Sequence, residues 1–188
     1  MSESGRNGSG GRRRSARSEQ NETGQKPDAI EKSPIAKGLE LLARREHSAR
    51  ELATKLLKGG HDRAESAAAI DQLRANNQQS DTRFAELLAR SRAARGYGPR
   101  RIVAELKSHG VGDVDIAAAL ADADCDWKAA AQRQLERHYG RAAPAKSAPH
   151  ASKERARRAA FLLRRGFDAA TVSALTRTVV DDSDDAFE

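Results

Sequence analysis

The sequence predicts an all-α protein made of three tandem three-helix repeats, and three observations lead to that fold class. Ala, Arg, Leu, Glu and Lys dominate the chain and β-branched residues are few, which favours helices over strands. Short amphipathic segments alternate with serine, aspartate and glycine at the spacing of helix starts and stops. A pattern of two anchors and a glycine recurs three times: Leu52, Leu56 and Gly60; Ile102, Leu106 and Gly110; Arg158, Leu162 and Gly166.

The repeat extends past each glycine, because Ser66, Ile116 and Val172 each lie six residues further on. A unit of this size cannot bury its apolar face alone, so neighbouring repeats should stack. The third copy lies further along than the second by a few extra residues, which a loop rich in proline and alanine can accommodate. It also has Arg158 where the other two copies have an apolar anchor.

The first repeat is expected at residues 34–78. Its first helix runs from Pro34 to near Glu46. Ser48, with Glu51 three residues later, has the spacing of a capping box that starts the second helix, and Gly59-Gly60 ends it. Asp62 starts the third helix, which runs to about Asn76.

The second repeat is expected at residues 79–123. Ser80 or Asp81 caps a helix that ends at Arg95, and Pro99 opens a helix that runs to His109. Asp113 is expected to cap the last helix of the repeat. The residues that should point inward from that helix are Val114, Ile116, Ala117 and Leu120.

The third repeat is expected at residues 124–178. Asp124 or Asp126 caps its first helix, and a loop at 141–151 follows. Ser152 then starts a helix that stops at Gly166, and Asp168 caps the next. Residues 1–33 are predicted to be a disordered basic and polar tail, and residues 179–188 an acidic tail.

Charge indicates the kind of partner. The formal net charge is +7. The first 33 residues carry a net +2 and the last eight a net −5, so the helical middle carries about +10. A basic body of this kind favours polyanions or acidic protein surfaces. The single cysteine excludes an intrachain disulfide, and no signal peptide or membrane-spanning run is seen, so we expect a cytoplasmic protein that does not enter the membrane.

The sequence offers no set of residues for catalysis, for binding a cofactor or for holding a metal. The five histidines are scattered without ligand spacing, and Cys125 has no second cysteine nearby. Asp122, Asp124 and Asp126 resemble a metal-binding run. They fall where one helix ends and another begins, so helix capping explains them better.

The candidate functional site is the joint between the two helices at the middle of the chain. Gly96, Gly98 and Pro99 are expected to set its angle. Tyr97 either packs under the joint or contacts a partner. The arginines around it, Arg92, Arg95, Arg100 and Arg101, are the main candidates for contact, together with Lys107 and a second basic group at Arg157, Arg164 and Arg165.

These residues carry a family resemblance. The run Arg95-Gly96-Tyr97-Gly98-Pro99-Arg100-Arg101-Ile102, followed by Glu105-Leu106 and Gly110-Val111, resembles the central signature of the RecX family. The segment from Leu41 to Leu52 resembles the first repeat of that family. The resemblance covers about residues 35–177 and is strongest in the first two repeats.

The resemblance implies an elongated, curved array of three-helix repeats that modulates the RecA recombinase. Such a protein would be a monomer lying in the groove of the filament that RecA forms on single-stranded DNA. It would mainly inhibit ATP hydrolysis and strand exchange, with possible contact to the DNA. Two alternatives stay open: a helix-turn-helix-like protein that binds DNA directly, and a helical adaptor. The third helices begin with Asp62, Asp113 and Asp168, whose charge weighs against direct reading of DNA.

Overall fold

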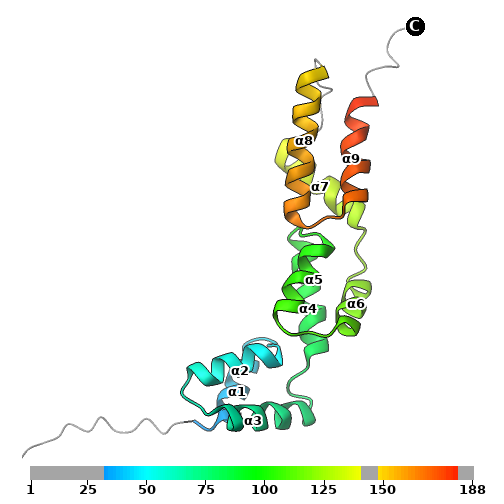
Figure 1. Cartoon of the computed structure of the whole chain (residues 1–188). Helices are drawn as coiled ribbons and strands as arrows, with labels where there is room; N and C mark the ends of the chain where they lie inside the picture. Colours follow the sequence, from blue (N-terminus) through cyan, green and yellow to red (C-terminus); the bar gives the residue numbers. More distant parts are fainter. Residues whose placement is uncertain (1–31, 141–147, 182–188) are drawn as a thin grey trace, which may run out of the picture. The chain divides into compact units, whose positions relative to one another are not determined.

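The structure of the protein, a computed structural model, describes residues 32–140 and 148–181. Helices and short connections make up this part of the chain, and no strand occurs within it, which confirms the all-α prediction (Figure 1). The helices are α1 (Pro34–Leu42), α2 (Ala49–Lys58), α3 (Arg63–Ala75), α4 (Asp81–Ala94), α5 (Pro99–Ser108), α6 (Asp113–Asp122), α7 (Trp127–Tyr139), α8 (Ala148–Arg165) and α9 (Ala169–Asp181).

The same glycine turn follows the second helix of each three-helix group. Gly60, Gly110 and Gly166 have φ values of +93°, +80° and +88°. In each turn the residue after the glycine donates its N–H to a carbonyl five residues earlier, as from Val111 to Leu106 at 3.2 Å. This is the Schellman motif, in which a left-handed glycine satisfies the last carbonyls of a helix. The recurrence of the turn supports the internal repeat seen in the sequence.

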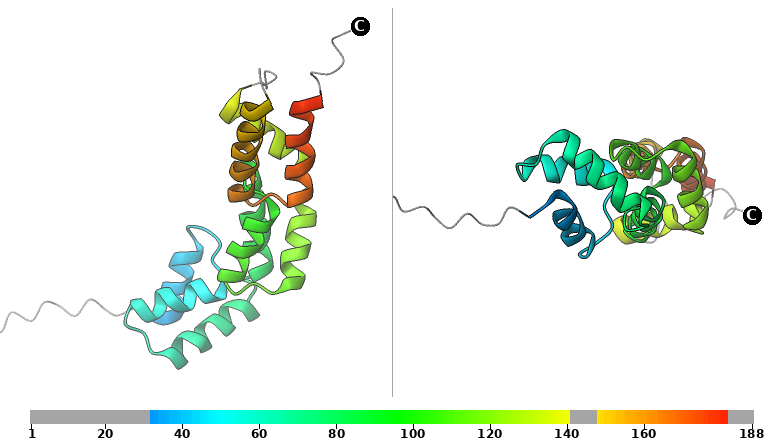
Figure 2. Two further views of the ribbon diagram at one scale, coloured as in Figure 1. Left: turned by 45° about the horizontal axis from the view of Figure 1, so that its top comes forward. Right: turned by 90° about the horizontal axis from the view of Figure 1, so that it is seen from below.

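The third helix of each group packs against the first: α3 on α1, α6 on α4 and α9 on α7 (Figures 1 and 2). Each group encloses its own small apolar core. Leu56, Leu106 and Leu162 are fully buried at the equivalent place in these cores. The residues six positions after each glycine, Ser66, Ile116 and Val172, are buried too.

Arg158 occupies the buried position in the third group that an apolar residue holds in the first two groups. Its exposed fraction is 7%. Its Nε donates to Oε1 of Glu154 at 2.9 Å, and its guanidinium lies 5.2 Å from the centre of the Tyr139 ring. The carboxylate and the aromatic face compensate the charge, so the aliphatic stem of arginine can occupy a leucine's position.

Most of the predicted helix starts are confirmed. Ser48, Asp62, Ser80 and Asp126 each accept a backbone N–H of the following helix. Asp168 accepts the N–H of Thr171 at 2.8 Å in the same way at the start of α9.

Three expectations in the first and second groups are wrong. The first helix ends at Leu42, four residues before Glu46. Asp113 does not cap α6; the cap position is Gly112, and Asp113 lies in the first turn, where a negative charge is still favourable. Because Ile116 and Ala119 form the buried face of α6, Val114 and Ala117 point outward, and Val114 is 84% exposed.

The ends of the predicted segments also need correction. Helix α8 begins at Ala148 rather than Ser152, so the last residues of the predicted loop at 141–151 are helical. Pro149 near its start is compatible with a first helical turn. Helix α9 continues to Asp181, into the predicted acidic tail, and Ser33 caps α1 at the edge of the predicted disordered tail. Residues 1–31, 141–147 and 182–188 lie outside the described residues. Within the described part, no helix is both long enough and apolar enough to cross a bilayer.

Candidate functional site

The α4–α5 joint (residues 95–99) is a glycine turn followed directly by a helix start. Gly96 has φ +77°, and Tyr97 donates its N–H to the Arg92 carbonyl at 3.0 Å, which closes another Schellman motif. Gly98 occupies the cap position of α5 without a side-chain cap, and Pro99 is the first residue of that helix. The turn therefore reverses the chain within four residues and fixes the direction in which α5 leaves.

The joint packs backbone to backbone against the α8–α9 corner (residues 165–167). The N–H of Gly98 donates to the Arg165 carbonyl at 2.8 Å, and the N–H of Arg100 donates to the Gly166 carbonyl at 3.0 Å. A Cβ on Gly98 would lie 2.4 Å from backbone atoms of Gly166 and Phe167. Only glycine fits at this approach, so the joint also connects the second three-helix group to the third.

Gly96 is enclosed in a different way. A Cβ there would overlap the side chain of Gln134, which is buried on α7. Tyr97 is half-buried between the two groups.

Two arginines, one from each group, hold this contact. The guanidinium of Arg101 lies 4.5 Å from the centre of the Tyr97 ring, and that of Arg165 lies 5.8 Å from it. Arg165 donates from Nη1 to the carbonyls of Arg95 and Gly96 at 3.2 and 3.3 Å. Arg101 donates from Nη1 to the Arg164 carbonyl at 3.4 Å. Both side chains therefore position the contact as well as adding charge to it.

Arg92, a predicted contact residue, forms an internal ion pair. It donates from Nε and Nη2 to the two carboxylate oxygens of Glu105 at 2.8 and 2.5 Å, across α4 and α5. The hydrogen bonds from Arg92 lower the pKa of Glu105 and raise the pKa of Arg92, so both groups are ionised near neutral pH. The pair braces the two helices, and its charges largely cancel.

Lys107 lies apart from the joint. It pairs with Asp113 at 2.9 Å near the other end of α5. Both side chains are exposed, so the pair contributes little to stability.

The other predicted arginines are open. Arg95, Arg100, Arg157 and Arg164 are exposed, and none of their guanidinium groups has an ion pair or hydrogen bond with another described residue. Arg100 is the second residue of α5, and Arg164 is the residue before the last of α8. Arg157 lies two turns earlier on the same face of α8. The structure thus brings the joint and the α8–α9 corner together, with Arg101 and Arg165 over Tyr97 and Arg95, Arg100 and Arg164 exposed beside them in the chain. We call these five residues the arginine cluster.

Beside the cluster is a shallow cavity of about 430 Å³, lined by Arg92, Arg95, Tyr97, Arg101, Ala104 and Glu105. Since Arg92 and Glu105 neutralise each other, the remaining charge of the lining is positive. An anionic group is the ligand that suits this lining.

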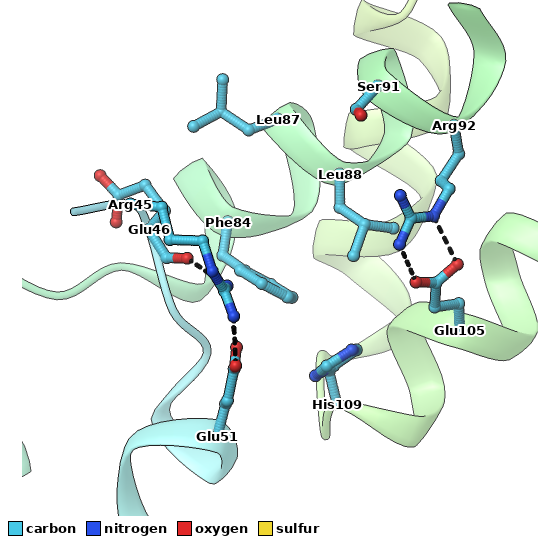
Figure 3. A pocket seen from close by; sticks show the side chains of 10 residues that line it. All are labelled: Arg45, Glu46, Glu51, Phe84, Leu87, Leu88, Ser91, Arg92, Glu105 and His109. Atoms are coloured by element: carbon cyan, nitrogen blue, oxygen red, sulfur yellow. Dashed lines mark hydrogen bonds and ion pairs between the residues drawn. The ribbon is translucent and has the colours of Figure 1, made fainter. Parts of the chain in front are cut away.

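Sequence reasoning missed a second pocket, drawn in Figure 3. It has a volume of about 330 Å³ between the α1–α2 connection and helices α4 and α5. Phe84, Leu87 and Leu88 form an apolar wall, and the ion pairs Arg45–Glu51 and Arg92–Glu105 flank it. The sequence carries no signal for this pocket, because Leu87 looks like a core residue there and only the structure shows that it is 50% exposed.

The residues considered for chemistry have structural partners. Asp126 caps α7, and Asp122 pairs with Arg90 at 2.8 Å. Burial raises the pKa of the Cys125 thiol, which makes it a poor nucleophile at neutral pH. Among the described residues no group of histidine, cysteine and acidic side chains is arranged to hold a metal ion.

The fold and the site define a protein of tandem three-helix units joined through glycine corners, with arginines gathered at one of those corners. Two family models match the chain: "RecX, first three-helix domain" at residues 35–73 and "RecX, second three-helix domain" at residues 80–120. The chain belongs to the RecX family.

Relatives and solved structures agree with this assignment. "Regulatory protein RecX" of Stenotrophomonas maltophilia is 40% identical over 160 residues, which cover 85% of this chain and 95% of the relative. The protein of the same name from Halorhodospira halophila is 42% identical over 146 residues, covering 78% and 88%. The fold resembles a crystal structure of regulatory protein RecX, with a TM-score of 0.64 at 19% identity over 77% of this chain and 70% of that one. It also resembles RecX from Lactobacillus salivarius, with a TM-score of 0.59 at 17% identity over 78% and 96%.

Proposed function

We propose that this protein is a non-enzymatic cytoplasmic regulator that binds the filament of RecA on single-stranded DNA and mainly inhibits its ATPase and strand-exchange activities. Membership of the RecX family and the word "regulatory" in the names of its relatives support the proposal. In this proposal the repeats form an elongated, curved monomer that lies along the filament. It needs no cofactor.

The observation that carries the proposal is the arginine cluster. The guanidinium groups of Arg101 and Arg165, one from each three-helix group, lie over one half-buried tyrosine. Three exposed arginines lie beside them in the sequence, and backbone hydrogen bonds fix the corner. Arg95, Arg100 and Arg164 are free to meet carboxylates of a protein groove or phosphates of the strand inside it. Because the backbone of the corner is already fixed, binding needs to order only these exposed side chains.

The starts of the third helices weigh against direct reading of duplex DNA. Asp62 and Asp168 accept backbone N–H groups at the beginnings of α3 and α9, and these hydrogen bonds lower the pKa of both carboxyl groups. Both are therefore ionised at neutral pH, at the end of the helix that a helix-turn-helix protein inserts into the groove.

The test is a titration of the protein into RecA filaments on single-stranded DNA, with ATP hydrolysis as the readout. We expect inhibition by the wild-type chain, and we expect the combined Arg95→Glu, Arg100→Glu and Arg164→Glu variant to need at least about tenfold more protein for the same inhibition. Arg63→Glu is a control for charge reversal, because Arg63 is an exposed arginine on α3 in the first three-helix group. Unchanged ATP hydrolysis at saturating wild-type protein would refute the proposal. Tight, sequence-dependent binding to free duplex, measured against salt, would favour the DNA-binding alternative.

A further inference from the structure

Two cavities along α4 and α5 share one wall, the ion pair between Arg92 and Glu105. This pair lines both the pocket walled by Phe84, Leu87 and Leu88, which we call the apolar pocket, and the cavity at the arginine cluster, which we call the basic cavity. Its two side chains are each 26% exposed, and Figure 3 shows them at the edge of the apolar pocket. The two cavities are therefore adjacent, and one ligand can enter both.

The spacing of the cavities follows from the face of α4 that they share. Phe84, Leu88 and Arg92 recur every four residues, and Arg95 continues the same face three residues further on. From Leu88 to Arg95 the helix axis rises by about 10 Å. Three extended residues also span about 10 Å. A segment that fills both cavities should therefore carry its two contact groups at residues i and i+3 of an extended chain.

The apolar pocket is lined by charges that are already paired. Each carboxylate in its lining has an arginine partner: Glu46 with Arg83, Glu51 with Arg45 and Glu105 with Arg92. Because these charges cancel, the lining favours no ion. Leu87, half exposed on the apolar wall, is the surface that a ligand would cover. A large uncharged side chain is the group that suits this pocket.

The basic cavity has the opposite requirement. Arg95 and Arg101 line it, and the guanidinium group of Arg95 has no ion pair or hydrogen bond with another described residue. A carboxylate or a phosphate would satisfy this group. A protein segment and a nucleic acid can each supply such an anion, so the apolar pocket has to decide between them.

A nucleic acid fits only the basic cavity. Its bases bind proteins mainly by stacking on open aromatic faces. Phe84, the aromatic residue of the apolar pocket, is 4% exposed, and Tyr97 in the basic cavity already has the guanidinium of Arg101 at 4.5 Å from its ring centre. We propose that the two cavities bind one protein segment, with a large apolar side chain in the apolar pocket and an Asp or Glu carboxylate in the basic cavity. That the RecA filament presents this segment rests on the proposed function.

The direct test is an NMR titration of the full chain with the peptide acetyl-Leu-Ala-Ala-Glu-amide. We expect chemical-shift changes at Leu88 and Ala104 that follow one saturation curve, with an affinity of about 1–10 mM. Replacing the peptide's leucine by asparagine, or its glutamate by glutamine, removes one contact. Each replacement should weaken binding by about fivefold or more.

Two exposed leucines of the chain provide matched variants. Leu87→Asn should weaken binding of the leucine peptide about tenfold and leave binding of the asparagine peptide unchanged. Leu57→Asn should change neither, because Leu57 is 42% exposed on α2 and lines neither cavity. Both leucines are about half exposed, so neither variant should unfold. Arg95→Gln should remove the preference of the chain for glutamate over glutamine in the peptide.

Three results of the titration would overturn the proposal. The absence of saturable changes would show that the cavities do not bind such a segment. Equal binding of the leucine and asparagine peptides would show that the apolar pocket takes no part. Changes at Ala104 with inorganic phosphate or oligothymidylate, and none with the peptide, would assign the basic cavity to a nucleic acid.

The identity of the partner is tested in the RecA ATPase titration. Leu87→Asn should need about tenfold more protein than the wild-type chain for the same inhibition, and Leu57→Asn should match the wild type. If the wild-type chain inhibits and Leu87→Asn inhibits equally well, the apolar pocket does not meet the filament, and the proposed function still stands. If the wild-type chain does not inhibit, the proposed function fails, and the peptide titration still decides whether the two cavities form one site.

Discussion

Replacing Gly98 by alanine should separate the second three-helix group from the third. The added Cβ would lie 2.4 Å from the carbonyl carbon and oxygen of Gly166 and from the N–H nitrogen of Phe167, none of which can move independently. Relieving the overlap costs about 1–3 kcal/mol of strain if the corner stays docked. If it moves away, the hydrogen bonds to Arg165 and Gly166 are lost, at about 1 kcal/mol each. By either route we therefore expect the free energy of unfolding to fall by about 1–3 kcal/mol.

The control is Gly112→Ala. Gly112 occupies the same cap position at the start of α6 with a similar backbone, φ −71° and ψ 154° against −82° and 164° at Gly98. A Cβ there would have as its nearest neighbour Oδ2 of Asp115, at 3.9 Å. The loss at Gly112 should therefore stay below about 1 kcal/mol. Urea unfolding followed by circular dichroism measures both variants. Equal midpoints for the two alanine variants would refute the packing argument for the joint.

Two further changes test the ion pairs. The pKa of Glu105 is lowered by Arg92, so its contribution to stability is present above the unfolded-state pKa of about 4.3 and is lost as the pH falls through the lower folded-state value. The urea midpoints of the wild-type chain and Glu105→Gln should therefore differ at pH 7 and converge as the pH falls through the lowered folded-state pKa of Glu105. A difference that does not vary with pH would contradict this. In the third group, Arg158→Leu should change the free energy of unfolding by less than about 1 kcal/mol, whereas Glu154→Ala, which leaves Arg158 buried without its carboxylate, should cost about 2 kcal/mol. If both variants lost the same free energy of unfolding, the conclusion that position 158 favours an apolar side chain would be wrong.

The local elements of the fold could be predicted because their signals act over four to six residues. A serine or aspartate before a helix bonds an N–H two or three residues ahead, and a glycine after it adopts positive φ; both are visible in the sequence. The inward face of α6 was predicted wrongly because it depends on contacts over more than four to six residues. The inward face of α6 depends on what α4 presents to it, so Val114 was misplaced while Ile116 was not.

The partners of the arginines could not be predicted, because they depend on contacts between distant segments. Arg165 bonds carbonyls 69 and 70 residues earlier in the chain, and Arg92 meets Glu105 only through the packing of α4 on α5. The glycine at the cap position of α5 did not reveal the contact either, because Gly112 holds the same position at α6 with open space around it.

The structure divides the arginines around the joint into two kinds, and this division decides what mutagenesis can show. Arg101 and Arg165 donate to backbone carbonyls across the two groups, so their loss would weaken the corner and displace every neighbouring charge. The side chains of Arg95, Arg100 and Arg164 make no such bonds, so charge reversal there changes the surface and leaves the backbone bonds of the corner intact. A loss of inhibition in variants of the first kind would not distinguish a contact from a misplaced corner. Variants of Arg95, Arg100 or Arg164 that keep the wild-type urea midpoint leave the corner intact. A loss of inhibition in these variants can therefore be assigned to weaker binding of the partner.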